Sequence, residues 1–272
     1  MKYKIIVKKI STNIVLIIVA LIALLPLMYM IRISFSPTKY FTSIDQASGF
    51  TLTHYHEVFL HSEFPRLLLN SFVTSVISTI IVIFIGSLAG YALARFNFKK
   101  REDLLMFILS TRMGPPVAFA IPIFLLMFQF DLIDKTIGLI LVYIFMNLAY
   151  TVWMMQGYFS ELPVEIEEAG MMDGLNRLGV LFRIAFPLVI PGLFASTIFV
   201  FISTWNEFFY AFVLTRMDAK TWPTRMPGFA GNFQIAWGEI FAASLVAVLP
   251  AIISGILIRR FLAKSLSFGA IE

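Results

Sequence analysis

Long apolar runs, separated by short polar segments, make up most of this chain. Each run has roughly 20 or more residues, the length that a helix needs to cross a bilayer core of about 30 Å. The pattern therefore predicts an all-α integral membrane protein. We expect a single membrane domain over residues 1–272, with six spans: 13–31, 67–94, 104–130, 136–158, 191–214 and 240–262.

The first run, 13–31, has a second interpretation. Several lysines lie near the N-terminus, and a basic segment followed by an apolar one is also typical of a signal peptide. The run is long for a signal peptide, and Ile31-Arg32-Ile33 lacks the small residues of a cleavage site. We therefore expect an uncleaved span.

Composition agrees with this prediction. Hydrophobic residues make up 59% and charged residues 14% of the chain, with a mean hydropathy of +0.87, whereas a soluble domain is about half apolar and about a quarter charged. The absence of cysteine excludes disulfides and thiolate metal sites. The net charge of +5 indicates basic cytoplasmic loops rather than nucleic-acid binding, because no basic cluster interleaved with aromatic residues lies elsewhere.

The distribution of Lys and Arg predicts the orientation. With the N-terminus in the cytoplasm, thirteen of the 21 Lys and Arg residues fall on the cytoplasmic side and seven outside, while Arg112 lies within the third span. Cytoplasmic loops carry the excess of positive charge in membrane proteins. We expect a multi-pass protein of the cell (inner) membrane with both termini cytoplasmic. Two long external segments, about 32–66 and 215–239, are either partner-binding surfaces or ordinary loops.

The polar segment between the fourth and fifth spans differs from the rest of the chain. Pro163 suits the first turn of a helix, the glutamates that follow favour its positive end, and Gly174 is suited to end it in a left-handed cap. These residues predict a short helix over Pro163–Asp173. Ala169 and Gly170 carry little bulk, so another protein surface could approach this helix closely.

The chain then turns back toward the membrane. We expect a corner at Asp173 and Gly174, a second helical piece over Asn176–Ile184, and a break or kink at Pro187 and Pro191. The pattern alone leaves two interpretations open for this cytoplasmic elbow: a docking surface for another protein, and an interfacial amphipathic loop without a partner.

The elbow resembles the EAA loop of ATP-binding-cassette (ABC) importer permeases, which contains Glu-Ala-Ala, a later Gly and an Ile-x-Leu-Pro element. The chain departs from this pattern at Gly170, where Ala is usual and helix propensity falls by about 1 kcal/mol, and at Phe186, where Leu is usual. The matching residues are Glu168, Ala169, Asp173, Gly174, Ile184 and Pro187. The resemblance implies that the ATPase-coupling residues are Glu168, Ala169, Gly170, Asp173, Gly174 and Pro187.

Two further patches resemble carbohydrate permeases of the maltose/trehalose type, in particular their second permease subunit. They are Arg112–Pro116 with Ile121-Pro122 in the third span, and Trp205–Thr215 in the fifth. The resemblance implies a homologous permease partner, two cytoplasmic ABC ATPase subunits, and an external substrate-binding protein or lipoprotein. It also implies alternating access, in which the elbow moves as a rigid body when the ATPases close around ATP.

No energy-converting chemistry is expected on the chain itself. A phosphate-binding Gly-x-x-x-x-Gly-Lys-[Ser/Thr] loop does not occur in the sequence. We therefore expect a non-catalytic subunit without catalytic residues, metal ligands or cofactors, the ATP and Mg²⁺ being bound by the partner ATPases.

Polar residues within the spans form a second group of candidates, because they are costly in lipid. Asn206 and Glu207 lie in the fifth span, and Asn147 and Thr151 lie on one face of the fourth. They either line the path of a sugar or form hydrogen bonds between helices. Arg112 receives no role at this stage.

Several alternatives stay open. The solute could be maltose, trehalose, another oligosaccharide, or a non-sugar such as glycerol phosphate. An ion-coupled secondary transporter would need midplane carboxylates and internal repeats, and Glu207 is its one credible carboxylate. The C-terminal tail, 266–272, either contacts the ATPases or frays. His54, His56 and His61 are weak candidates for a zinc site.

Overall fold

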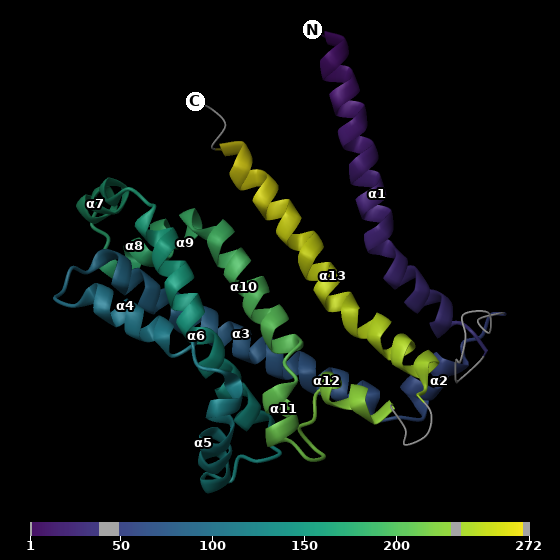
Figure 1. Ribbon diagram of the computed structural model, residues 1–272. Helices are drawn as coiled ribbons and strands as arrows, with labels where there is room; N and C mark the ends of the chain where they lie inside the picture. The colour runs from purple at the N-terminus through teal and green to yellow at the C-terminus, as the bar shows by residue number, and fades with distance from the viewer. Residues whose placement is uncertain (1, 38–48, 230–234, 269–272) are drawn as a thin grey trace. The chain divides into compact units, whose positions relative to one another are not determined.

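The computed structural model describes residues 2–37, 49–229 and 235–268, with side chains described over 12–37, 49–229 and 235–257. Every element in these ranges is helical. In chain order (Figure 1) they are α1 (Lys2–Ser34), α2 (Thr53–Leu60), α3 (Phe64–Arg95), α4 (Arg101–Ser110), α5 (Pro116–Gln129), α6 (Thr136–Ser160), α7 (Val164–Met172), α8 (Arg177–Val180), a π-helix (Leu181–Ala185), α9 (Phe186–Leu188), α10 (Ile190–Trp205), α11 (Phe209–Leu214), α12 (Trp222–Arg225), a 3₁₀-helix (Met226–Phe229) and α13 (Trp237–Phe268).

The chain divides into two compact units. The smaller unit comprises Met1–Pro65 and Met226–Leu249, and the larger comprises Arg66–Arg225 and Pro250–Glu272. Most of the C-terminal tail, 266–272, lies outside the described residues, so both interpretations of it, contact with the ATPases and a frayed end, stay open.

Four helices are long and apolar enough to span a membrane: Thr12–Ser34, Phe64–Arg95, Thr136–Ser160 and Trp237–Leu257. They correspond to the first, second, fourth and sixth predicted spans. A fifth candidate is the pair Arg177–Leu188 and Ile190–Trp205, which is bent by 79°. The structure thus supports four to five candidate spans, within the described residues, rather than six uninterrupted ones.

The predicted third span, 104–130, is not one continuous helix. It is divided into α4 and α5 by residues 111–115, where Pro115 is extended with φ −64° and ψ 135°. A residue that precedes a proline is pushed out of the helical region, and Pro115 is followed by Pro116. The predicted fifth span, 191–214, is likewise interrupted, because α10 ends at Trp205 and α11 begins at Phe209.

Glycines allow α3 and α6 to pack closely in the larger unit. A Cβ atom at Gly86 would lie 2.6 Å from Thr151 Cγ2, and one at Gly90 would lie 2.8 Å from Gln156 N. Residue numbers thus increase in the same direction along both helices at these contacts, so α3 and α6 run parallel. Small residues spaced four apart are a common way to bring membrane helices together.

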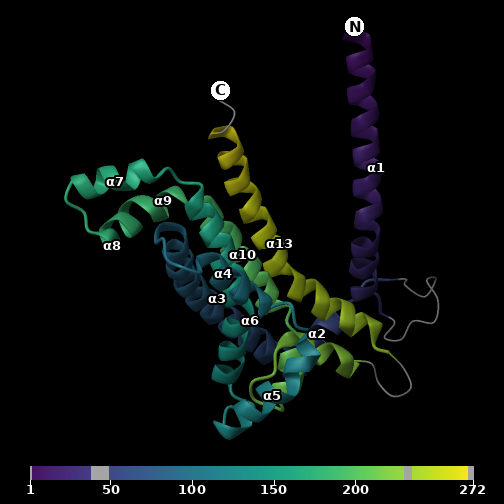
Figure 2. The same ribbon diagram turned by 60° about the vertical axis from the view of Figure 1, so that its left-hand side comes forward.

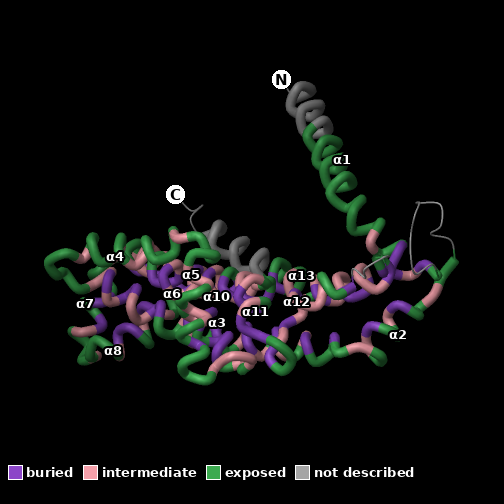
Figure 3. The backbone as a smooth tube through the Cα atoms, turned by 60° about the horizontal axis from the view of Figure 1, so that its bottom comes forward, coloured by how far each residue is buried: buried purple, intermediate pink, exposed green. Residues whose placement is uncertain are grey.

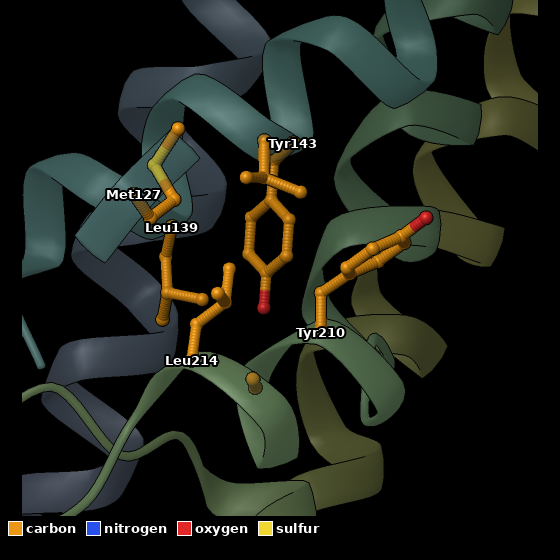
Figure 4. Close-up of a cluster of buried hydrophobic side chains, with 7 residues drawn as sticks. Met127, Leu139, Tyr143, Tyr210 and Leu214 are labelled. Carbon is orange, nitrogen blue, oxygen red and sulfur yellow. The ribbon is translucent and has the colours of Figure 1, made fainter. Parts of the chain in front are cut away.

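A cluster of buried side chains holds α5, α6 and α11 together at one end of the larger unit. The ring of Tyr143 lies between aliphatic side chains, including Leu139 and Leu214, and the ring of Tyr210 (Figure 4). The residues labelled there are Met127, Leu139, Tyr143, Tyr210 and Leu214. A second cluster, which includes Tyr91, Met155 and Phe159, joins the far ends of α3 and α6 to the segment that precedes α10.

In the smaller unit, α1 is exposed along nearly its whole apolar length from Thr12 (Figure 3). Such a helix needs lipid or another protein around it. The end of α1 contacts α2, where the Ser34 hydroxyl lies 2.9 Å from the Tyr55 hydroxyl. His54, one of the three candidate zinc ligands, is buried, and its Nε2 atom lies 2.8 Å from the Ser36 carbonyl oxygen.

Candidate functional site: the elbow between α6 and α10

The first half of the elbow is α7, whose ends follow from its sequence. Pro163 lies at the N-cap, with φ −57° and ψ 131°, so its missing N–H leaves no hydrogen bond unmade. At the other end Gly174 has φ +90°, a conformation that costs other residues energy. The amide of Leu175 donates to the Gly170 carbonyl at 3.1 Å and closes the cap. The predicted helix over Pro163–Asp173 is confirmed.

The second half returns beside α7, as Figure 2 shows. The Asn176 side chain accepts a hydrogen bond of 2.7 Å from the Gly179 amide and caps α8. The predicted piece over Asn176–Ile184 is helical, but its second part is a π-helix that the sequence did not predict. Pro187 lies inside α9, and the 79° bend falls at Val189, directly before Ile190 and Pro191 begin α10.

A buried ion pair fixes the elbow to the end of α3. Arg95 Nε donates to Glu167 Oε1 at 2.8 Å, and the side chains of these two residues are only 5% and 4% exposed. The Tyr91 hydroxyl donates to Glu167 Oε2 at 2.8 Å, and Arg95 also donates to the Leu162 carbonyl at 3.0 Å. Every oxygen of the buried carboxylate thus has a partner, which a buried charge requires.

This anchor divides α7 into two faces. Glu167 and Gly170 are buried, whereas the opposite face is exposed. Spacings of three and four residues place side chains on one side of a helix, and the exposed face has this spacing: Glu165, Glu168, Ala169 and Met172. Met172 is 88% exposed, and Val164 and Ile166 of the same helix are exposed as well, so α7 presents several apolar side chains together, which is typical of a contact surface.

The expectation for Gly170 is wrong in one respect. It was expected to leave room for another protein, but it faces inward. A Cβ atom there would lie 2.2 Å from Ile184 Cδ1, so the missing side chain lets α7 pack against the returning segment. Ala169, by contrast, is exposed as expected.

The other predicted coupling residues are accessible. Glu168, Asp173 and Gly174 are all exposed. Within the described part of the chain, the carboxylates of Glu168 and Asp173 make no hydrogen bond or ion pair. The sequence analysis missed Glu167 and Arg95, and the one available signal was the charge of Arg95 at the end of a span.

The structure buries Asn147 and Thr151 on one face of α6, where they are 1% and 0% exposed. Asn147 Nδ2 donates to the Tyr143 carbonyl at 2.9 Å, and the Thr151 hydroxyl donates to the Asn147 carbonyl at 3.0 Å. The methyl group of Thr151 meets Gly86. Thr151 therefore packs against α3, whereas Asn147 Oδ1 has no hydrogen-bond partner among the described residues.

Asn206 and Glu207 lie elsewhere, at the break between α10 and α11. Asn206 is exposed, and its Nδ2 donates to the Ile202 carbonyl at 3.0 Å. The Glu207 carboxylate accepts hydrogen bonds from the amides of Tyr210 and Ala211, at 2.9 and 3.1 Å. Glu207 therefore caps the free amides of α11. The structure does not bring this pair together with Asn147 and Thr151.

Known proteins share both the sequence and the fold of this chain. Residues 82–268 match the family model described as "Binding-protein-dependent transport system inner membrane component". The inner membrane ABC transporter permease protein YcjP of Escherichia coli is 33% identical over 93% of this chain and 92% of its own length. The trehalose/maltose transport system permease protein MalG of Thermococcus litoralis is 32% identical over 98% of both.

Two solved structures are similar in fold. One chain belongs to a bacterial ABC transporter involved in the import of the acidic polysaccharide alginate; it has a TM-score of 0.75 and 26% identity, over 93% of this chain and 96% of that one. Another, from a bacterial alginate ABC transporter in complex with an alginate-bound periplasmic protein, has a TM-score of 0.69 and 15% identity, over 93% and 94%. The second likeness concerns the fold alone.

Proposed function

The chain belongs to the family of binding-protein-dependent transport system inner membrane components, and on that premise we propose that its elbow couples sugar import to ATP hydrolysis on separate subunits. It is a multi-pass membrane protein and a permease subunit of an ABC importer. The observation that carries the proposal is the arrangement of α7, a short helix that exposes one face while a buried ion pair on its other face fixes it to α3.

The proposed role of α7 is to transmit force from an ATPase to the spans. Its exposed face, with Glu168, Ala169 and Met172, docks in a groove on the ATPase subunit. Its buried face is tied through Glu167 to Arg95 at the end of α3. When the ATPases close around ATP, movement of α7 therefore reaches a span directly, and the pathway alternates between inward-open and outward-open.

The proposed solute is a sugar. Support comes from relatives whose names specify trehalose, maltose and diacetylchitobiose, and from the alginate importer of similar fold. A non-sugar solute such as glycerol phosphate is the alternative within the same class. No feature of the described residues favours the ion-coupled alternative, because Glu207 is already engaged in capping α11.

The proposed assembly contains this chain, a homologous permease, two cytoplasmic ABC ATPases that carry ATP and Mg²⁺, and an external substrate-binding protein. This chain is the non-catalytic part, with both termini in the cytoplasm. We also propose that Asn206 and Glu207 lie beside the solute path at the α10–α11 break. Thr151, whose methyl group meets Gly86 of α3, then contributes to helix packing next to this path, and Asn147 lies buried one turn before it on α6.

Glu168→Lys tests the coupling role. The assembled importer is reconstituted in liposomes, and ATP-driven sugar uptake is measured together with retention of the ATPases during purification. We expect uptake to fall at least about tenfold, since one lost charged contact at an interface is commonly worth 2 kcal/mol or more. The melting temperature of the permease should not change, because Glu168 is exposed and its carboxylate makes no hydrogen bond or ion pair within the described residues.

The matched control is Glu102→Lys, which reverses another exposed carboxylate, on α4, and should leave uptake unchanged. Wild-type uptake in Glu168→Lys, with the ATPases retained, would contradict the proposal. An equal loss in the control would also contradict it, because the effect would then come from net charge.

A further inference from the structure

A small cavity opens at the break between α4 and α5, within the stretch predicted as the third span. Its volume is about 210 Å³, smaller than the roughly 300 Å³ at which drug-sized pockets begin. It thus has room for a single small unit. Its walls come from the 111–116 segment, α5, α6 and α11, and include Thr111, Arg112, Phe119, Phe145 and Tyr210.

Arg112 gives this cavity its charge. Its guanidinium donates to the Met146 carbonyl of α6, and an arginine has five N–H donors in all. Among the described residues no carboxylate forms an ion pair with it. Arg112 falls within the predicted third span, where a charged residue is a functional candidate by default, and the structure places it, exposed, in the break before α5.

The residues described as lining the cavity include no carboxylate that could supply the opposite charge. Glu207 lies three residues before Tyr210, and its carboxylate accepts hydrogen bonds from the amides of Tyr210 and Ala211. The N-terminus of α5 also adjoins the cavity at Pro116, and the amide dipoles of a 14-residue helix add positive potential there. The cavity therefore favours a negative group.

Aromatic rings complete the wall. A Cβ atom at Gly114 would lie 2.3 Å from Phe119 Cε2, so this ring lies against the bare backbone of the break. The Tyr210 hydroxyl donates to the Pro116 carbonyl at 3.2 Å and holds α11 to the start of α5. Ring faces next to a guanidinium fit a ligand with an apolar ring face and a charged substituent.

We propose that this cavity is a solute subsite for one anionic sugar unit, with Arg112 binding its carboxylate, sulfonate or phosphate oxygens and Phe119 contacting its ring. The inference rests on the proposed function, because it makes the cavity a site where the imported solute binds during its passage. Two other occupants are possible in the assembled importer: a neutral sugar unit, and a carboxylate of the partner permease that pairs with Arg112.

The absence of cysteine makes a thiol probe specific. Thr111→Cys, in the assembled importer, is labelled with methanethiosulfonate reagents of opposite charge, and mass spectrometry reads the modification on this chain. We expect the anionic reagent to label the thiol faster than the cationic one. Arg112→Gln should lower the ratio of the anionic to the cationic labelling rate about tenfold. The ratio cancels any effect of Arg112 on the reactivity of the thiol itself.

A second cavity provides the control. Thr197→Cys lies in a mainly apolar cavity whose described lining includes Phe84, Phe186 and Leu193 but no charged residue, so its rate ratio should not respond to Arg112→Gln. Glucuronate should slow labelling of Thr111→Cys, whereas glucose at the same concentration should not. Arg112→Lys should retain part of the protection, and Arg112→Gln none.

Three results would overturn the inference: a ratio of labelling rates that does not change in Arg112→Gln, protection of Thr111→Cys from labelling by glucose equal to that by glucuronate, or no labelling of Thr111→Cys at all. The first is also the result expected if a partner carboxylate already neutralises Arg112. ATP-driven uptake by the same preparation separates this inference from the proposed function. An importer that pumps sugar but fails the labelling test refutes the subsite alone, whereas one that never pumps refutes the proposed function.

Discussion

Two carboxylates flank α6, and each holds a connecting segment of the larger unit in a different way. Glu167, after the end of α6, is buried and pairs with the guanidinium of Arg95. Asp134, before its start, accepts hydrogen bonds of 2.9 to 3.1 Å from consecutive backbone amides of residues 216–219. One anchor is made by side chains and the other by the main chain.

The difference shows which connection depends on particular residues. Backbone amides are supplied by any sequence, so the Asp134 anchor needs one residue, whereas the Glu167 anchor needs a matched pair. Partial burial alone would raise the pKa of the Asp134 carboxyl, but the backbone N–H donors of residues 216–219 outweigh it and lower the pKa to about 2. The anchor beneath the elbow is therefore the more fragile one.

Breaking the Glu167 anchor should have the largest effect. Arg95→Met leaves the Glu167 carboxylate buried without its counter-charge, which costs about 3–5 kcal/mol. We expect a large drop in the melting temperature of the purified importer and loss of ATP-driven uptake. The double variant Arg95→Met with Glu167→Leu should recover most of the melting temperature, because no charge remains buried. A single variant as stable as the wild type would show that the pair does not anchor the elbow.

Changing the corner of the elbow should have an intermediate effect. Gly174 has φ +90°, and nothing lies within 4 Å of a Cβ atom added there. Gly174→Ala therefore tests backbone strain alone and should cost about 1–2 kcal/mol, with a lower melting temperature and weaker uptake. Gly157→Ala is the matched control, since Gly157 is also open but lies inside α6. It should be neutral or slightly stabilising, and equal losses in both would refute the role of the corner.

Removing the charge of Asp134 should have the smallest effect. Asp134→Asn should cost about 1 kcal/mol at pH 7, because the side chain is partly open to solvent and the amides keep one acceptor. The folded-state pKa lies below the ordinary one, so the carboxylate stabilises above about pH 4 and loses this contribution as the pH falls toward 2.

Melting temperatures measured from pH 7 down to pH 3 check this sign. The difference in melting temperature between the wild type and Asp134→Asn should narrow as the pH falls. A constant difference would contradict the lowered pKa of the Asp134 carboxyl. Asp131→Asn is the control, because the Asp131 side chain is 93% exposed and its ion pair with Lys135 is of a kind that contributes little.

Local sequence signals predicted the helices and the corner of the elbow, but they did not predict how the elbow is attached to α3. Pro163 and Gly174 mark the two ends of α7 because Pro163 restricts the backbone and Gly174 permits the positive φ that the turn needs. The Arg95–Glu167 pair joins residues 72 positions apart, and no short pattern records which carboxylate meets which cation. Gly170 shows the same limit, since its smallness was evident but the side on which it was needed depended on Ile184.

The spans show a related contrast. Four long apolar runs became long helices, because an apolar run of bilayer length favours a single spanning helix. The third run failed as one helix because Gly114, Pro115 and Pro116 interrupt the backbone, a signal that hydropathy does not register. The π-helix at Leu181–Ala185 had no sequence signal that we used. Asn147 and Thr151 became candidates through their polarity alone, and the contact of Thr151 with Gly86 of α3 had no signal in the sequence.

The attachment points on α3 have a geometric consequence. This helix has 32 residues and is thus about 48 Å long. Near its start Arg66 binds Asp218 and Asn70 binds the Lys220 carbonyl, while Arg95 at its far end binds the elbow. A rotation of only about 10° around one end would sweep the other end through about 8 Å. A small rotation of α3 at the end that binds α7 would thereby move its other end, on the opposite side of the bilayer, by several ångströms.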